Sequence, residues 1–318
     1  MQQKPLKIVY LTPALYMAGG VERVLTLKAN YFAEHFGYDI TISLLRREIN
    51  FLNDIKDGSR KIGELHINRA NYRNFNTQNV GVVKRLFAKY WSHSLVAHLR
   101  CLDKLVVLTE KDREAWVELN NVVAIPDPLS LYPKEISPLT EKRVIAVARY
   151  SHEKGIDLLL KAWSIVEKRV RDWRLEVYGD GNRTPYNQLI EELRIDNSRC
   201  VLHGRTDNVG AEYVNSSIFV LSSRFEGFGM VLTEAMACGL PVVSFDCPWG
   251  PRSIIANGDD GLLVENGNVE ALADSLTLLM DDANLRQRMA ANGIKNVQRF
   301  SVEHIAECWK ELFESTAQ

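Results

Sequence analysis

The sequence is poor in the features that mark secreted, zinc-binding or membrane-spanning proteins. Its five cysteines are scattered with no C-x-x-C pair, which disfavours a disulfide framework or a zinc site and fits a reducing cytoplasm. No apolar run approaches the roughly 20 residues that a membrane span needs. The N-terminal run IVYL is short and Pro13 follows it closely, so we expect no signal peptide. These absences predict a cytoplasmic protein.

Several motifs of nucleotide and metal chemistry are also absent. No G-x-G-x-x-G follows the first expected strand, which disfavours an NAD-binding oxidoreductase, and there is no P-loop. No D-x-D triplet or other metal-ligand set is evident, so we expect no metal ion. Nothing in the sequence suggests nucleic-acid recognition.

The composition is that of an ordinary globular protein, with 46% hydrophobic and 25% charged residues. A chain of 318 residues suits two domains of roughly 150 residues each. The net charge of −1 hides an asymmetry, because residues 1–140 hold 19 Lys and Arg against 14 Asp and Glu, which leaves 20 against 26 in the remainder. The two halves are therefore expected to meet different partners.

Apolar strands alternate with amphipathic helices along most of the chain, which predicts α/β domains with parallel sheets covered on both faces. Residues 46–80 have little periodicity, and four prolines between 126 and 138 indicate a linker. Strands are expected at 6–12, 38–45, 104–109, 121–125, 143–148, 174–179, 200–204, 217–223, 241–245 and 261–264. Helices are expected at 21–36, 81–100, 110–119, 155–170, 185–195, 208–215, 230–238 and 300–314.

The stretch SRFEGFGMVLTEAMACGLPVV (223–243) places two glutamates, Glu226 and Glu234, in an apolar and glycine-rich context. The loop RFEGFG follows an expected strand, and glycines there let the backbone approach a ligand at the start of a helix, where N–H groups attract anions. Glu234 lies about one turn into that helix, so its side chain points back towards the same end. Both carboxylates are therefore expected beside one anion-binding helix start. For Glu234 alone, a structural ion pair or a helix cap is an equally good interpretation.

The segment E-G-F-G-M-V-L-T-E followed by A-C-G-L-P-V-V closely resembles the E-x7-E motif of family 4 retaining glycosyltransferases, also called glycosyl transferases group 1. The resemblance covers residues 143–315, and more loosely residues 6–45 and 104–128. It implies a GT-B fold, in which two Rossmann-like domains have a donor cleft between them, here with a shortened N-terminal domain. We accordingly expect an acceptor-side domain at 1–128, a linker at 129–141, a nucleotide-sugar domain at 142–300 and a terminal helix at 301–318 that returns to the first domain.

The resemblance implies roles for most of the candidate residues, and the metal-free expectation agrees with it because a diphosphate leaving group needs cations. Glu226 would contact the transferred sugar and Glu234 the nucleotide ribose, while Arg149 and Lys154 would neutralise the diphosphate. The backbone amides of Phe228, Gly229, Met230 and Val231 would hold the pyrophosphate, Gly19 and Gly20 would form a first-domain phosphate loop, and Gly179 and Arg205 would lie near the nucleotide. His66 matches the acceptor-side histidine, although the serine of that family's loop is absent.

Two functions remain open. The first is a retaining hexosyltransferase that moves a hexose or N-acetylhexosamine from a nucleotide sugar to a saccharide or lipid-linked acceptor in cell-surface polysaccharide or lipopolysaccharide synthesis. We prefer a UDP-sugar over a GDP-sugar, by resemblance only, and expect no separate cofactor. The second is a sugar-nucleotide-binding protein with little transferase activity. A basic amphipathic helix at 82–93 either packs on the sheet or contacts the inner face of the cytoplasmic membrane.

Overall fold

The computed structural model describes residues 6–12, 20–44, 57–66, 69 and 94–317. The chain divides into two compact units. Unit 1 comprises Met1–Ser130 and Phe300–Gln318, and unit 2 comprises Leu131–Arg299.

Unit 2 is built on a six-stranded parallel sheet in the order β11-β10-β9-β6-β7-β8. The central strands are buried on both faces, which explains their continuous apolar sequences; every residue of β9 and β10 is buried. The chain starts in the middle at β6, moves outward to β8, and then returns to add β9, β10 and β11 on the other side. The strands are β6 (Arg143–Val147), β7 (Arg174–Tyr178), β8 (Cys200–His203), β9 (Ile218–Leu221), β10 (Val242–Phe245) and β11 (Gly261–Val264).

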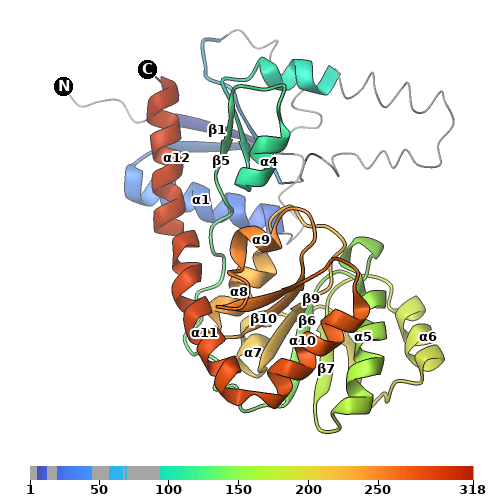
Figure 1. Ribbon diagram of the computed structural model, residues 1–318. Helices are drawn as coiled ribbons and strands as arrows, with labels where there is room; N and C mark the ends of the chain where they lie inside the picture. The colour runs from blue at the N-terminus through green and yellow to red at the C-terminus, as the bar shows by residue number, and fades with distance from the viewer. Residues whose placement is uncertain (1–5, 13–19, 45–56, 67–68, 70–93, 318) are drawn as a thin grey trace, which may run out of the picture. The chain divides into compact units, whose positions relative to one another are not determined.

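Helices cover both faces of this sheet (Figure 1). One layer holds α5, α6 and α10, and its core includes Trp163 of α5, which is fully buried. The other layer holds α7, α8 and α11. The helices are η3 (His152–Lys154), α5 (Ile156–Arg169), α6 (Thr184–Leu193), α7 (Val209–Val214), α8 (Met230–Ala237), α9 (Pro251–Ile254), α10 (Val269–Asp281) and α11 (Ala283–Val297).

Unit 1 is also parallel α/β in its described part, where β1 pairs with β2 and a second sheet has the order β3-β4-β5. The terminal helix belongs to this unit. Its apolar stripe, Ile305, Trp309 and Leu312, is buried in one cluster with Phe32 of α1 and Val106 of β4. The elements are β1 (Lys7–Thr12), α1 (Gly20–Phe36), β2 (Asp39–Leu44), β3 (Ile62–Leu65), β4 (Lys104–Val107), α4 (Glu110–Ala115), β5 (Val122–Ala124) and α12 (Val302–Ala317). The short helix η4 (Gln298–Phe300) contains the point in the chain where unit 2 ends.

The structure corrects three of the sequence expectations. Residues 46–80 include a strand, β3, which the poor periodicity concealed. The helix expected at 110–119 ends at Ala115, because the buried Trp116 leaves helical geometry with ψ of 53°. The strand expected at 217–223 ends at Leu221, so Ser223 belongs to the following loop. Of the helix expected at 81–100, residues 94–100 are helical, and its basic segment 82–93 lies outside the described residues.

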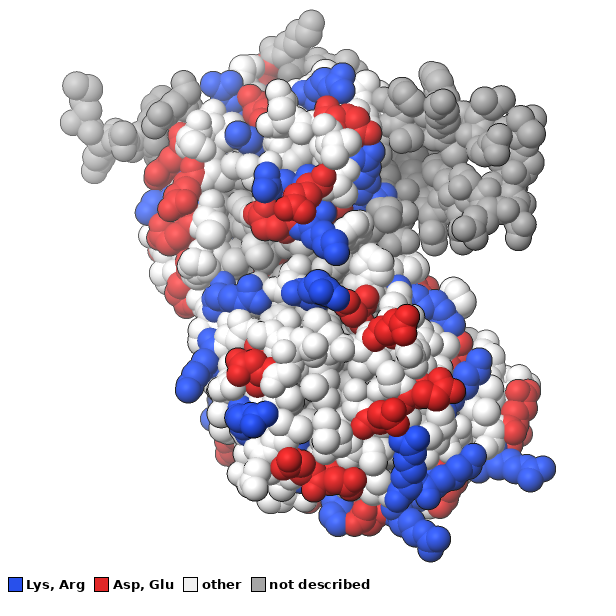
Figure 2. Space-filling view, in the orientation of Figure 1, with Lys and Arg blue, Asp and Glu red and all other residues white. Residues whose placement is uncertain are grey.

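Within the described residues, no helix is both long enough and apolar enough to cross a membrane. On the face shown in Figure 2, Lys and Arg side chains are interspersed with Asp and Glu, and no broad patch of one sign is visible among the described residues.

Candidate functional site

The strand order of unit 2 fixes where a ligand is expected. The chain leaves β6 for β7 on one side and later returns to place β9 on the other side, so the connections after β6 and β9 run in opposite directions. Ligands of doubly wound sheets bind outside the carboxyl ends of the strands at this switch point. The segment after β6 carries Arg149 and Lys154, and the segment after β9 carries Glu226.

Lys154 and Glu226 meet at this point although 72 residues separate them. The Nζ of Lys154 donates to Oε1 of Glu226 over 2.7 Å, and the Oγ of Ser223 donates to the same oxygen over 2.6 Å. Glu226 is 8% exposed, so its carboxylate is held in a nearly dehydrated position with a fixed orientation. The structure thus brings together two residues that the sequence assigned to the sugar and the diphosphate.

A bidentate ion pair, which the sequence did not predict, joins the segment after β6 to the segment after β9. The two terminal nitrogens of Arg224 donate to the two carboxylate oxygens of Asp157, over 2.8 and 2.7 Å. The backbone N–H of Arg224 also donates to the carbonyl of Glu153 over 2.8 Å. Because Arg224 and Glu226 share one loop, this pairing sets the distance from Glu226 to the η3 segment that carries Lys154.

The loop after β9 leads into the helix start that the sequence predicted at Met230. Gly229 caps α8 with a φ of 103°, a conformation that favours glycine. The first N–H groups of a helix have no partner within it and attract anions. Phe228 is buried, and Met230 and Val231 are half-buried. The four residues expected to hold a pyrophosphate therefore lie around the start of α8.

Glu234 lies in α8 and is 1% exposed. Its charge and, to a larger degree, burial raise the pKa of the neighbouring Cys238 thiol to about 12. Arg149, in contrast, is mostly exposed and lies 3.3 Å from Glu153. Glu234 therefore lies inside the helix layer, whereas Arg149, one of the two predicted cations, is accessible to a ligand.

The two loops predicted to lie near a nucleotide are adjacent. The N–H of Gly179, after β7, donates to the carbonyl of Gly204, after β8, over 3.3 Å. A side chain at Gly179 would clash with the carbonyl oxygen of Ala148, because its Cβ would lie 1.8 Å away. Arg205 follows Gly204 and is exposed.

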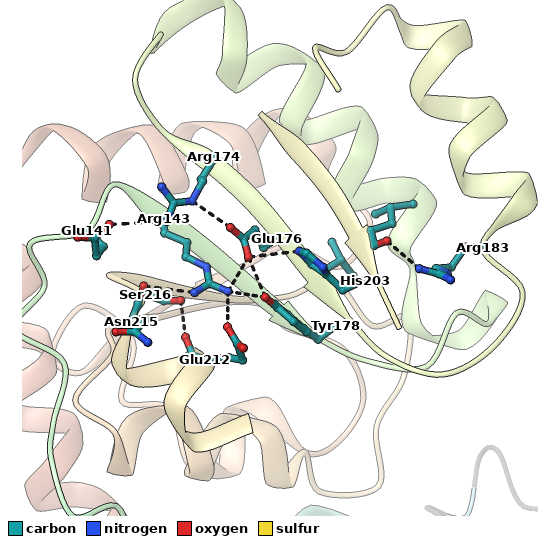
Figure 3. Close-up of polar contacts among 12 residues, drawn as sticks. Glu141, Arg143, Arg174, Glu176, Tyr178, Arg183, His203, Glu212, Asn215 and Ser216 are labelled. Carbon is teal, nitrogen blue, oxygen red and sulfur yellow. Dashed lines mark hydrogen bonds and ion pairs between the residues drawn. The ribbon is translucent and has the colours of Figure 1, made fainter. Parts of the chain in front are cut away.

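A buried polar network supports the strands from which these loops emerge (Figure 3). Arg143 donates to the hydroxyl of Tyr178 over 2.7 Å and pairs with Glu176 at 2.6 Å and Glu212 at 2.7 Å. Burial and the hydrogen bond to Glu176 raise the pKa of Tyr178. The Tyr178 ring stacks on His203 with centroids 4.3 Å apart. The network fixes the ends of β7 and β8, and the sequence analysis did not anticipate it.

The unit 1 candidates divide into described and undescribed residues. Gly20 begins α1 and is exposed, whereas Gly19 lies outside the described residues. His66 directly follows β3 and lies between two carboxylates. Its Nε2 is 3.3 Å from Oε1 of Glu64, and its Nδ1 is 3.4 Å from Oδ1 of Asp127.

Glu64, His66 and Asp127 are the one group of described residues whose potential ligand atoms lie close enough together to share a metal ion. Their charge does not favour that use. The ammonium of Lys28 already lies 2.5 Å from the Glu64 carboxylate and compensates its charge. Burial alone would lower the pKa of His66, but the charges of Asp127 and Glu64 raise it to about 10, which favours the cationic form of the ring. The group is thus electrically balanced by side chains.

Gly155 separates Lys154 from α5, and replacing it tests how tightly this corner of the site is built. Its φ is 62°, and a Cβ there would lie 2.0 Å from the carbonyl oxygen of Ser222. Gly155→Ala is therefore expected to cost about 3 kcal/mol of unfolding free energy, from left-handed strain plus overpacking. Thermal and urea unfolding measure it.

Gly267→Ala is the matched control for this substitution. Gly267 has a similar φ of 81° but no atom within 4 Å of the added Cβ, so strain alone should cost about 1 kcal/mol. If the two variants lost the same unfolding free energy, Gly155 would not lie in close contact with the carbonyl of Ser222.

Residues 131–296 match the family described as Glycosyl transferases group 1. The chain belongs to this family. The match covers the whole site of unit 2, from the segment after β6 to α11. The family resemblance inferred from the E-x7-E motif is thereby confirmed at the level of the family.

Two curated relatives and one solved structure describe this membership further. An uncharacterized glycosyltransferase of Haemophilus influenzae is 34% identical over 215 residues, which is 66% of this chain and 61% of that protein. The poly(ribitol-phosphate) alpha-N-acetylglucosaminyltransferase of Staphylococcus aureus is 28% identical over 264 residues, which is 81% of this chain and 51% of that protein. The chain therefore spans less than two thirds of the length of these relatives.

The crystal structure of Anabaena Alr3699/HepE with UDP-glucose superposes with a TM-score of 0.76, over 98% of this chain and 100% of that one. At 16% identity this likeness concerns the fold. The two Rossmann-like α/β units are thus those of a GT-B glycosyltransferase, as the sequence predicted.

Proposed function

We propose that this chain is a retaining, metal-independent glycosyltransferase. It transfers a hexose or N-acetylhexosamine from a nucleotide sugar to a saccharide or lipid-linked acceptor in cell-surface polysaccharide synthesis. The observation that carries the proposal is the Lys154–Glu226 pair at the switch point of unit 2, next to the helix start at Gly229. This arrangement combines a cation for the diphosphate with a carboxylate for sugar hydroxyls.

The electrostatics of unit 2 support transfer without a metal ion. A departing nucleoside diphosphate gains negative charge in the transition state, and fixed cations and helix N–H groups stabilise that charge. Lys154, the exposed Arg149 and the start of α8 supply such groups in one unit. In this proposal the carboxylates of Glu226 and Glu234 contact the sugar and the ribose and do not bind a metal ion.

Retention is supported by the name of the Staphylococcus aureus relative, which describes an alpha-linked N-acetylglucosamine product. Common UDP-hexoses carry the sugar in the α configuration, so an alpha-linked product has retained it. The acceptor hydroxyl would then attack on the face that the diphosphate leaves, and a diphosphate oxygen would take its proton. The same relative acts, by its name, on poly(ribitol-phosphate), which supports our proposal of a polymeric acceptor.

The donor base is tested by ligand-induced stabilisation. UDP at about 100 times its Kd should stabilise the protein by about 2.7 kcal/mol, which is a rise in Tm of several degrees. GDP at the same concentration should give less, and ADP serves as a control for non-specific anion binding. Differential scanning fluorimetry across the three nucleotides measures the order.

A larger rise with GDP would reassign the donor, and no rise with any of the three would remove the donor-site proposal. Stabilisation alone does not distinguish a transferase from a sugar-nucleotide-binding protein. Release of UDP from UDP-sugars in the presence of saccharide acceptors makes that distinction, because only a transferase couples release to formation of a glycoside.

A further inference from the structure

Three loops of unit 2 meet at one buried tyrosine. Tyr150 directly follows Arg149 in the segment after β6 and is 7% exposed. Its hydroxyl lies 2.7 Å from the carbonyl oxygen of His203, at the end of β8, and 2.9 Å from that of Val177 in β7. A hydroxyl has one hydrogen, so it donates to one of these carbonyls at a time. Among the described residues, the bond to His203 is the one hydrogen bond that joins the segment after β6 to the end of β8.

The backbone of Tyr150 is also tied to the loop after β7. Its N–H donates to the carbonyl of Asp180 over 2.7 Å, and it pairs with Gly181 in an isolated parallel bridge. A Cβ on Gly181 would lie 3.1 Å from the carbonyl oxygen of Tyr150, so the two backbones are in close contact. Tyr150 therefore connects both loops that are expected near a nucleotide to the segment that carries Arg149.

The carbonyl of His203 is a fixed anchor for the Tyr150 hydroxyl. The His203 ring stacks on Tyr178 with centroids 4.3 Å apart (Figure 3). The hydroxyl of Tyr178 in turn accepts from Arg143 over 2.7 Å and donates to Glu176 over 2.8 Å. The hydrogen bond from Tyr150 thus holds the segment after β6 against a part of the sheet that the buried network already fixes.

A nucleoside diphosphate has two ends that are bound together. Joining two weak ligands raises the affinity of the joined molecule only when their two subsites lie at the right separation. We propose that Tyr150 is a positioning residue that fixes the separation between Arg149, which would neutralise the diphosphate, and the loops after β7 and β8, which would hold the nucleoside. The inference rests on the proposed donor site, and it assigns Tyr150 no contact with the reacting atoms.

Tyr150→Phe tests this role, because it removes the hydroxyl and keeps the ring and the backbone contacts. The affinity for UDP should fall about 10-fold, since the two subsites are no longer held at one separation. The affinities for uridine alone and for inorganic pyrophosphate alone should each change less than about threefold, because each of these ligands occupies one subsite. Calorimetric titration of the full chain measures the Kd of UDP, and competition against UDP measures the two weaker ligands. If GDP binds the wild type more tightly than UDP, GDP and guanosine replace UDP and uridine.

Tyr186→Phe is the matched control. Its ring packs on Tyr150 with centroids 5.6 Å apart, and no hydrogen bond joins its hydroxyl to the described residues of the three loops. It should bind all three ligands as the wild type does. Gly181→Ala is a second variant, in which the added Cβ pushes the loop after β7 away from Tyr150 and leaves the hydroxyl in place. It should show the same selective loss of UDP affinity, and it decides the question if Tyr150→Phe does not fold.

Two results would overturn the proposal. One is an unchanged affinity for UDP in Tyr150→Phe, and the other is an equal loss of affinity for UDP, uridine and pyrophosphate, which a merely structural role predicts. If the wild type binds neither UDP nor GDP, the donor site and the role of Tyr150 fail together.

A kinetic readout separates this proposal from the proposed function. In Tyr150→Phe the KM for the sugar nucleotide should rise about 10-fold while kcat stays within about twofold, because Tyr150 touches no reacting atom. A selective loss of UDP affinity in a protein that transfers no sugar would support the role of Tyr150 and refute the transferase proposal.

Discussion

Glu226→Ala is expected to lower the rate of sugar transfer by about 100-fold or more, while nucleotide affinity stays within about threefold. The reason is that the carboxylate of Glu226 is fixed by Lys154 and Ser223, at 2.7 and 2.6 Å. Glu226 is not part of the start of α8, where the phosphates are proposed to bind. If Glu226 positions the sugar as proposed, removing it frees the sugar but leaves the N–H groups of α8 intact. Initial rates of glycoside formation and calorimetric titration with UDP measure the two quantities.

The control for Glu226→Ala is Glu118→Ala. Glu118 also lies 2.6 Å from a basic side chain, Arg69, but belongs to unit 1 and to no candidate site. Its loss should leave transfer unchanged. A Glu226→Ala variant that transfers sugar at the wild-type rate would refute the role assigned to Glu226.

A substitution of Lys154 tests the binding of the diphosphate. Lys154→Met should weaken UDP binding by about 10-fold, because the diphosphate loses a cation, and it should also reduce transfer. Unchanged UDP affinity in Lys154→Met would mean that this lysine only orients Glu226. The two variants together therefore separate sugar positioning from diphosphate binding.

The strands of unit 2 were predictable from sequence because their signals are local, whereas α9, α10 and α11 were not among the expected helices. Its strands are short apolar runs between amphipathic helices, and all six were located within two residues at each end. The start of α8 followed from the glycines before Met230, and Gly229 indeed has a positive φ. The strands could be located because a parallel strand that is buried on both faces needs a continuous apolar sequence.

The Asp157–Arg224 pair escaped prediction for a physical reason. Asp157 reads as a favourable acidic residue in the first turn of α5, and Arg224 reads as a solvated loop residue. Only the tertiary fold brings these side chains together across 67 residues of sequence. Pairings of this kind leave no local periodicity.

Unit 1 was less predictable, and Lys28 shows why. In β3, the sequence IGEL contains a glycine and a glutamate, so it lacks the apolar run of a central strand. Lys28 stands in the buried stripe of α1 with Val24, Leu25 and Phe32, where a charge is unexpected. That position was a usable signal, since a lysine on an apolar helix face requires a buried carboxylate. The identity of the carboxylate, Glu64, could not be read from sequence.

The second large effect, on stability, is expected at the Lys28–Glu64 pair. Glu64→Gln should destabilise unit 1 by about 3–5 kcal/mol, because it leaves the Lys28 ammonium buried without its counter-ion. Lys28 is 1% exposed and cannot reach water without moving α1 away from Trp309. Hydrogen exchange at the amides of β3 and β4 reports the loss within unit 1, and thermal unfolding reports it for the whole chain.

The double variant Lys28→Met/Glu64→Gln distinguishes a lost ion pair from lost packing. Removing both charges should recover most of the stability, because no buried charge is then unpaired. If the double variant is as unstable as the sum of the two single variants, the ion pair is not the cause.

The pH dependence of unit 1 gives an independent check on the same charges. Lys28 and His66 lower the pKa of Glu64 from 4.5 to about 2 against the effect of burial, so its contribution to stability is present above pH 4.5 and is lost as pH falls towards 2. The pKa of His66 is raised from 6.5 to about 10, so its contribution is complete below pH 6.5 and is lost as pH rises towards 10. Protection of the β3 amides should therefore be greatest between pH 4.5 and 6.5, once corrected for intrinsic exchange. In the double variant the acid limb should disappear, because no carboxylate remains at position 64, while the alkaline limb should weaken because only Asp127 then attracts the His66 proton.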